Sequence, residues 1–300
     1  MLGDVHAKIV SLPTVPTLEI DVSTAAIPSV RLNDNHTIPQ IGLGVWQVPD
    51  DVATDACLAA FEAGYRHIDT AALYGNEEGV GRAIKSSGIP REELFITTKV
   101  WNTDQGRDKT IAAMESSLAK LDLDYVDLYL IHWPTPGRDL YLETWETVLQ
   151  MHQQGLTRSP GVSNFHAEHL RRIVDATGVT PVINQVELHP WLPQREVRSV
   201  DAELGIVTEA WSPLASGGLL EDATLAAIGA KYEKSAAQVM IRWHLQLGNV
   251  VLPKSVTPAR IAENIDVFDF ELDADDLIAI EGLEDESKRT GPNPDLFNEA

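Results

Sequence analysis

Short apolar runs alternate with longer segments of mixed polarity along most of the chain, and this pattern predicts strands and helices in turn. The predicted strands span residues 42–46, 67–70, 95–100, 126–132, 159–163, 182–187, 206–211 and 250–253. The predicted helices begin near Val52, Glu77, Gln105, Leu140, Ala167, Gln194, Thr224, Ala236, Pro258 and Ala274. Such alternation implies parallel strands, and eight units of strand and helix predict an α/β (β/α)8 barrel.

The segments that flank this repeat are simpler. Residues 30–41, VRLNDNHTIPQI, predict a β-hairpin that turns at Asn33–Asn35 and caps the far end of the barrel. No linker rich in Gly, Ser or Pro divides the chain, so we expect residues 29–300 to form a single barrel domain with a short irregular C-terminal tail, GPNPDLFNEA. Residues 1–28 are expected to be an extended N-terminal arm, since they lack the basic start and apolar core of a secretory signal.

Composition narrows the range of partners. A hydrophobic content of 44% in 300 residues is ordinary for a globular protein, and no apolar run has the length of a membrane span. The net charge of −22 disfavours nucleic acid and anionic membranes, but it allows an anionic cofactor in a local basic pocket. The single cysteine, Cys57, excludes an intramolecular disulfide and fits the cytoplasm, where we expect it to be a packed, inert thiol.

Three polar residues fall near the carboxyl ends of successive predicted strands. Asp69, Lys99 and His132 follow one another at intervals of roughly 30 residues, the length of one barrel unit. Tyr74 stands in the loop after Asp69, within GYRHIDTAALYGNEEGVG. Because chemistry in such barrels is carried by this edge, we expect the four side chains to converge there. The alternative for each is structural: a buried Asp–Lys pair, a core histidine and a packed tyrosine.

The chain resembles the aldo-keto reductases over nearly all of residues 30–298. The motifs that carry the resemblance are GYRHIDTAALYGNEEGVGRAI, FITTKVW, LDLDYVDLYLIHWP, GVSNF, NQVELHP, WSPLASG and LPKSVTPARIAENIDVFDFEL. Within the family the tail is most similar to the bacterial 2,5-diketo-D-gluconate reductase-like branch. The resemblance implies a barrel that reduces carbonyls with NADPH and uses no metal.

The family's catalytic tetrad corresponds by motif position to Asp69, Tyr74, Lys99 and His132. Tyr74 would donate a proton to the carbonyl oxygen, and the ammonium of Lys99 would stabilise the phenolate and lower the tyrosine pKa. Asp69 would pair with Lys99, and His132 would donate a hydrogen bond to the substrate oxygen.

Cofactor and substrate residues follow from the same resemblance. Ser163, Asn164 and Gln185 would hold the nicotinamide carboxamide, and Trp211 would stack on the ring. The pyrophosphate loop would contain Ser212, Leu214 and Ser216. The 2′-phosphate and adenine would meet a helix that opens at Pro258 with Thr257 as its N-cap, through Lys254, Ser255, Val256, Thr257, Arg260, Glu263 and Asn264. The expected substrate walls are Trp46, Trp101, His132 and Trp133, with Trp191 as a further candidate.

Three further residues bear on metal binding and on strand geometry. His166 and His169 stand at helical spacing, but two ligands are too few for a zinc site. Pro160 occupies a strand position where the family usually has an aliphatic residue, so it either starts the strand or costs a hydrogen bond.

The expected function is NADPH-dependent reduction of aldehydes, ketones or diketones, with 2,5-diketo-D-gluconate and methylglyoxal-like compounds as candidate substrates. Two alternatives use the same barrel: a Schiff-base aldolase with Lys99 as nucleophile, and a non-catalytic NADPH-sensing subunit. We expect a monomer with a small-molecule carbonyl substrate.

Overall fold

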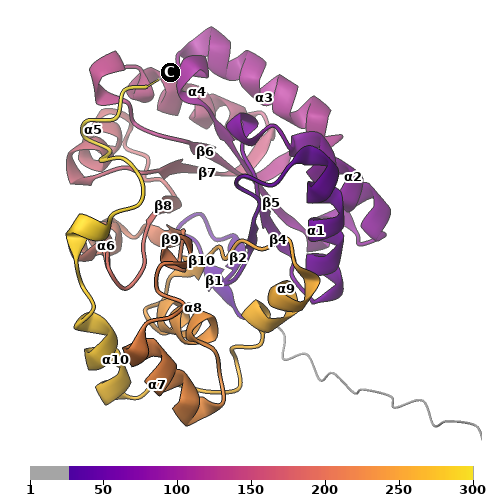
Figure 1. The fold of residues 1–300 in the computed structure, drawn as a ribbon. Coiled ribbons are helices and arrows are strands. Elements are labelled where there is room, and N and C mark those ends of the chain that lie inside the picture. Colours follow the sequence, from indigo (N-terminus) through magenta and orange to yellow (C-terminus); the bar gives the residue numbers. More distant parts are fainter. Residues whose placement is uncertain (1–26, 300) are drawn as a thin grey trace, which may run out of the picture.

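Eight parallel strands form a closed barrel in the computed structural model, which describes residues 27–299 (Figure 1). Each strand pairs with its neighbour in the sequence, and Ile41 bridges to Val251 to close the ring. The predicted (β/α)8 class is therefore confirmed, and the expected arm lies almost wholly outside the described residues. The strands are β3 (Leu43–Gly44), β4 (His67–Asp69), β5 (Phe95–Val100), β6 (Val126–Ile131), β7 (Thr157–Ser163), β8 (Ile183–Glu187), β9 (Val207–Trp211) and β10 (Val250–Val251).

Ten α-helices lie outside this barrel in the described part of the chain (Figure 1). Each turns an apolar face inward, as α1 does with Ala53, Cys57 and Ala60 at helical spacing. Cys57 is fully buried, as expected. The helices are α1 (Asp50–Glu62), α2 (Glu77–Ser87), α3 (Arg107–Leu121), α4 (Tyr141–Gln153), α5 (Ala167–Thr177), α6 (Arg195–Leu204), α7 (Ala223–Tyr232), α8 (Ala236–Gln246), α9 (Pro258–Ile265) and α10 (Ala274–Glu281).

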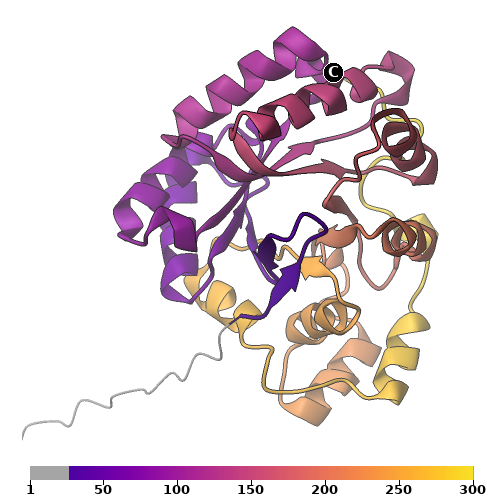
Figure 2. The ribbon, with the colours of Figure 1, turned by 180° about the vertical axis from the view of Figure 1, so that it is seen from behind.

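The predicted hairpin closes the amino-terminal end of the barrel (Figure 2). Its strands are β1 (Ser29–Arg31) and β2 (Thr37–Pro39), and Ile38 is completely buried. The side-chain amide of Asn33, in the turn, donates to the backbone oxygens of Pro181 and Gly205 just before β8 and β9. With this end plugged, the carboxyl ends of the strands are the open face.

Pro160 lies inside β7 rather than at its start, because the strand begins at Thr157. Its carbonyl oxygen accepts from Val182 N at 3.0 Å, so its nitrogen faces the same side, toward β8. Pairing between β7 and β8 begins only at Val162. The missing N–H therefore removes no hydrogen bond to β6.

The C-terminal tail returns to the open face of the barrel (yellow in Figure 1). After the 3-10 turn η6 (Glu286–Lys288) the described residues form no further helix or strand, as predicted. The side-chain amide of Asn102, after β5, donates to the backbone oxygen of Glu299 at 2.8 Å, and Gly137 N, after β6, donates to the Asn298 side chain. The tail thus bridges the loops that follow two strands.

Candidate active site

A cavity of about 1150 Å³ opens at the carboxyl ends of the strands. Of the site residues predicted from the sequence, all except Lys99 and Trp191 line it. They are Trp46, Asp69, Tyr74, Trp101, His132, Trp133, Ser163, Asn164, Gln185, Trp211, Ser212, Leu214, Ser216, Lys254, Ser255, Val256, Thr257, Arg260, Glu263 and Asn264. Lys99 lies just behind this surface and is fully buried.

The Lys99 ammonium, behind the cavity wall, binds three polar groups. It donates to Asp69 Oδ1 at 2.6 Å, to the Thr70 backbone oxygen at 2.9 Å and to the Tyr74 hydroxyl at 3.2 Å. An ammonium has three donors, so all of them are used. The Tyr74 oxygen accepts one of these bonds, which leaves its own proton available to a group in the cavity. The 3-10 turn η1 (Ala72–Tyr74), which directly follows β4, brings the phenol to this point.

The protonation states of Lys99 and Tyr74 follow from their burial and from the groups that contact them. Burial disfavours the Lys99 charge, but Asp69 and Tyr74 outweigh it, and the pKa of Lys99 is raised. The pKa of Tyr74 is also raised, because burial outweighs the opposing effect of the Lys99 ammonium. Burial therefore outweighs Lys99, which lowers the pKa of Tyr74 as expected. Tyr74 holds its proton firmly at neutral pH.

His132 faces the phenol across the cavity. Its ring lies 5.6 Å from that of Tyr74 and 5.0 Å from that of Trp101, between centroids. Burial, followed by the nearby Lys99 charge, lowers the pKa of His132 well below its ordinary value, so the ring is neutral. Its Nδ1 is buried without a partner among the described residues, whereas Nε2 is the ring nitrogen that reaches the cavity.

A second polar group lies at the ends of β7, β8 and β9. Asn164, in the left-handed conformation at φ 62°, donates to the His132 backbone oxygen and accepts from the Trp211 indole N–H at 2.9 Å. Ser163 Oγ donates to the Gln185 backbone oxygen at 2.8 Å. These bonds fix the Trp211 ring and the Gln185 backbone in the cavity wall.

The loop after β9 carries three non-glycine residues in the left-handed region. Ser212, Ala215 and Ser216 have φ values of 50°, 51° and 53°. Such conformations cost about 1–3 kcal/mol each and tend to cluster at ligand-binding sites. The Ser212 hydroxyl accepts from Ser216 N, which closes the loop on itself, and both residues line the cavity.

At the opposite wall, α9 begins beside two cations that no carboxylate pairs. Lys254 and Arg260 are exposed, and neither has a carboxylate oxygen within 4.0 Å in the described part of the chain. The neighbouring Lys234, by contrast, is held by Asp266 and Asp269. Thr257 is the N-cap residue, as predicted, and its side chain makes no capping bond. The first helical turn remains open to an anion.

Aromatic rings form the remaining wall. Trp46 lies 4.8 Å from Tyr74, and Trp133 lies 4.7 Å from Phe297, between ring centroids. Trp191 does not line the cavity; it packs against Gly218, where an added Cβ would lie 2.7 Å from its ring, and its prediction as a wall is wrong. The C-terminal tail, for which no role was predicted, also lines the cavity, through Thr290, Gly291, Pro292, Phe297 and Glu299.

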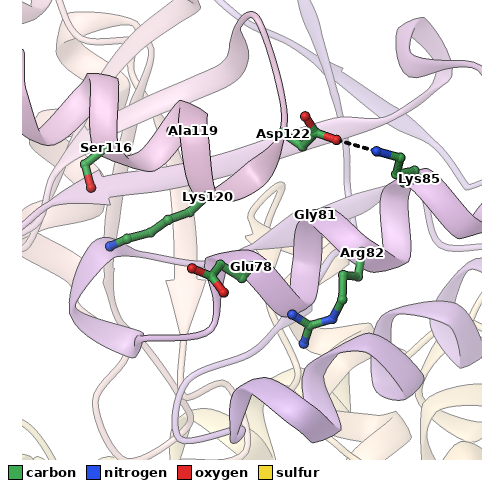
Figure 3. Close-up of a pocket in the computed structure, with 8 residues that line it drawn as sticks. All are labelled: Glu78, Gly81, Arg82, Lys85, Ser116, Ala119, Lys120 and Asp122. Atoms are coloured by element: carbon green, nitrogen blue, oxygen red, sulfur yellow. Dashed lines mark hydrogen bonds and ion pairs between the residues drawn. The ribbon is translucent and has the colours of Figure 1, made fainter.

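A second, shallower hollow lies on the outer surface between α2 and α3 (Figure 3). Its cations are paired: Lys85 with Asp122 at 2.7 Å and Arg82 with Asp50 at 2.6 Å. Because these charges are satisfied, this hollow offers little to a charged ligand. Residues 27–299 contain no group of three or more His, Cys, Asp or Glu side chains arranged to hold a metal, and no helix among them could cross a membrane.

A family model for the aldo/keto reductases matches residues 40–285, most of the chain and every strand of the barrel. The chain belongs to the aldo-keto reductase family. The family predicted from the motifs is therefore confirmed, and the chain is an oxidoreductase.

Relatives within the family are similar over nearly their whole length. An aldo-keto reductase of Mycobacterium sp. (strain KMS) is 55% identical and covers 90% of this chain and 98% of its own. Methylglyoxal reductase DkgA of Escherichia coli (strain K12) is 53% identical and covers 89% and 97%. A crystal structure of a Gox0644 variant in complex with NADPH is 48% identical, with a TM-score of 0.87 and coverage of 91% and 99%.

Proposed function

We propose that this aldo-keto reductase uses NADPH to reduce small, uncharged carbonyl compounds to alcohols, with Tyr74 as the proton donor. The observation that carries the proposal is the Lys99 network. Its three donors are all used, one of them on the Tyr74 oxygen, and the tyrosine proton is left to face the cavity. Asp69 keeps the ammonium charged and in place.

When bound, NADPH supplies a hydride to the carbonyl carbon. Tyr74 gives its proton to the carbonyl oxygen, so that C=O becomes CH–OH and the phenol becomes a phenolate beside Lys99. The ammonium stabilises that phenolate at 3.2 Å until solvent returns the proton. Neutral His132 holds the substrate oxygen by donating from Nε2, the ring nitrogen that reaches the cavity.

The cavity wall fits the cofactor at each end. Trp211 offers a flat ring for stacking, and the Gln185 carbonyl offers a free acceptor for a carboxamide. Ser212 and Ser216 lie between, on the left-handed loop suited to a pyrophosphate. Lys254 and Arg260, unpaired beside the start of α9, suit a 2′-phosphate, and the neighbouring Ser255, Val256, Thr257, Glu263 and Asn264 would surround the adenosine.

The substrate end of the cavity favours uncharged compounds. Its walls are Trp46, Trp101 and Trp133, with Phe297 from the tail. Among the described residues, the only Lys and Arg side chains that line the cavity are Lys254 and Arg260, which belong to the cofactor end. A ketoacid such as 2,5-diketo-D-gluconate would find no counter-ion here, whereas methylglyoxal needs none. The Escherichia coli relative is named as a methylglyoxal reductase.

The test is a steady-state screen of NADPH oxidation with methylglyoxal, neutral aldehydes and anionic keto-sugar acids. We expect the largest kcat/KM for neutral substrates. A larger kcat/KM for the anionic acids would contradict the proposed substrate class, and absence of NADPH oxidation with every carbonyl would contradict the reaction.

The Schiff-base alternative has little support in this geometry. A nucleophilic lysine must be neutral, yet Lys99 has a raised pKa and donates all of its hydrogen bonds. We therefore expect that borohydride will trap no carbonyl compound on Lys99.

A further inference from the structure

A buried carboxyl group lies directly beneath the proposed nicotinamide site, and the reaction described above does not use it. Glu209, on β9, is fully buried inside the barrel. Its Oε2 accepts from Gln185 Nε2 at 2.7 Å, while its Oε1 has no hydrogen-bond partner among the described residues. A buried carboxyl group in an apolar barrel is costly, so its presence calls for a function.

The Gln185 amide nitrogen is shared between two carboxyl groups. It donates to Asp69 Oδ2 at 2.8 Å and to Glu209 Oε2 at 2.7 Å. An amide has two N–H donors and one carbonyl oxygen, so both donors are used beneath the cavity. The carbonyl oxygen is left to face the cavity. The flipped amide would instead place its oxygen against the Asp69 carboxylate and leave the Glu209 carbonyl oxygen without a donor, which disfavours that orientation.

We propose that Glu209 is a positioning residue for the cofactor, because it selects the orientation of the Gln185 amide that presents a carbonyl oxygen to the nicotinamide carboxamide. The inference rests on the proposed use of NADPH. Glu209 itself touches neither the cofactor nor the substrate, and it acts through Gln185. Through the same amide it is linked to Asp69, and so to Lys99 and Tyr74.

The charges that surround Glu209 set its ionisation. Burial, followed by the negative charge of Asp69 on β4, raises the pKa of Glu209 to about 8. The hydrogen bond from Gln185 and the positive charge of Lys99 on β5 act in the opposite direction but are weaker. His67, also on β4 and 3.9 Å away, is neutral because burial lowers its pKa to about 3. At neutral pH Glu209 is therefore uncharged, and its carbonyl oxygen accepts from Gln185.

Ionisation of Glu209 has two opposite consequences. A carboxylate accepts the Gln185 N–H more strongly, which preserves the amide orientation. The new negative charge also raises the pKa of Tyr74, which makes the phenol a weaker acid. We therefore expect kcat for reduction to decline above about pH 8 while the affinity for NADPH does not.

Two substitutions separate these effects. Glu209→Gln keeps a carbonyl acceptor for Gln185 but cannot ionise, and Glu209→Met keeps similar volume without an acceptor. Binding is measured by quenching of tryptophan fluorescence, with NADPH and with adenosine 2′,5′-bisphosphate, which lacks the nicotinamide. We expect Glu209→Met to weaken NADPH binding by several-fold to about tenfold, the value of one hydrogen bond, and to leave the bisphosphate unaffected.

Glu209→Gln is expected to bind NADPH within about twofold of wild type and to lose the decline in kcat near pH 8. The double variant Glu209→Met with Gln185→Met should bind NADPH no more weakly than Gln185→Met alone. Unchanged NADPH binding in Glu209→Met, or equal losses for NADPH and the bisphosphate, would overturn the inference.

Should Glu209→Met not fold, the pH profile of Glu209→Gln decides: a decline near pH 8 equal to that of wild type would overturn the inference. Failure of wild type to oxidise NADPH with any carbonyl would instead refute the proposed function, so the two failures are distinguishable.

Discussion

Replacing Lys254 and Arg260 together by alanine is expected to remove the preference for NADPH over NADH. Both side chains line the cavity beside the start of α9, and neither is paired with a carboxylate within the described residues. NADH lacks the 2′-phosphate, so these two cations contribute to binding NADPH and contribute little to binding NADH.

The expected size of the NADPH preference depends on how exposed Lys254 and Arg260 are. Hydrogen bonds to charged groups contribute about 1.5–3 kcal/mol each. Because both side chains are exposed, we take about 1–1.5 kcal/mol for each. Their sum, about 2–3 kcal/mol, corresponds to a preference of roughly 30- to 150-fold. The double variant should lose that factor in kcat/KM for NADPH and lose it less at high salt, since screening already weakens the contact in wild type.

The assay compares kcat/KM for the two cofactors at a saturating carbonyl concentration. The matched control is Arg82→Ala with Lys85→Ala, which likewise removes one arginine and one lysine charge, but from the outer surface (Figure 3). The control should leave both values unchanged. Equal losses for NADPH and NADH in the Lys254 and Arg260 variant would refute the assignment of the 2′-phosphate site.

Three further substitutions test other parts of the structure. Lys99→Met should lower kcat by about 10²–10⁴-fold and, because a buried carboxylate is left unpaired, lower the free energy of unfolding in urea by about 3–5 kcal/mol; normal turnover would contradict the mechanism. Glu187 accepts from Thr290 and Gly291, so Glu187→Gln should speed amide exchange of the tail, and unchanged exchange would show that this bond does not hold it. Burial raises the pKa of Asp201 from its ordinary value of 3.8 to about 7, so ionisation of this group lowers the stability of the fold as the pH rises through that range. The Tm of Asp201→Asn minus the Tm of wild type should therefore increase between pH 5 and pH 8. A constant difference would contradict the raised pKa.

The barrel was predictable because its signal is local. Each strand is a short apolar run, and each helix follows within one unit, so the pattern predicted Phe95–Val100 as it was found and the start of α5 at Ala167. The polar residues at the strand ends were also predictable, since closing the barrel brings all such ends to one face. Asp69, Lys99 and His132 therefore converge from three neighbouring strands.

The errors concern properties that depend on long-range packing. Trp191 lies in a motif close to the cofactor residues, but its ring packs against Gly218 and does not line the cavity, which no sequence pattern indicates. The tail reaches the cavity through contacts between segments far apart in the sequence, such as those of Phe297 with Trp133 and of Glu299 with Asn102. The raised pKa of Tyr74 depends on how deeply the folded barrel places the phenol, and the sharing of the Gln185 amide depends on the register of β8 and β9.

The proton donor is tested most directly by Tyr74→Phe, because this change removes one hydroxyl and leaves the ring beside Trp46 and His132. The measurement pairs single-turnover reduction of methylglyoxal with the Kd of NADPH from fluorescence. We expect the rate of reduction to fall by about 10²–10⁴-fold, while the Kd stays within about twofold of wild type. A reduction rate within a few-fold of wild type would show that another group supplies the proton.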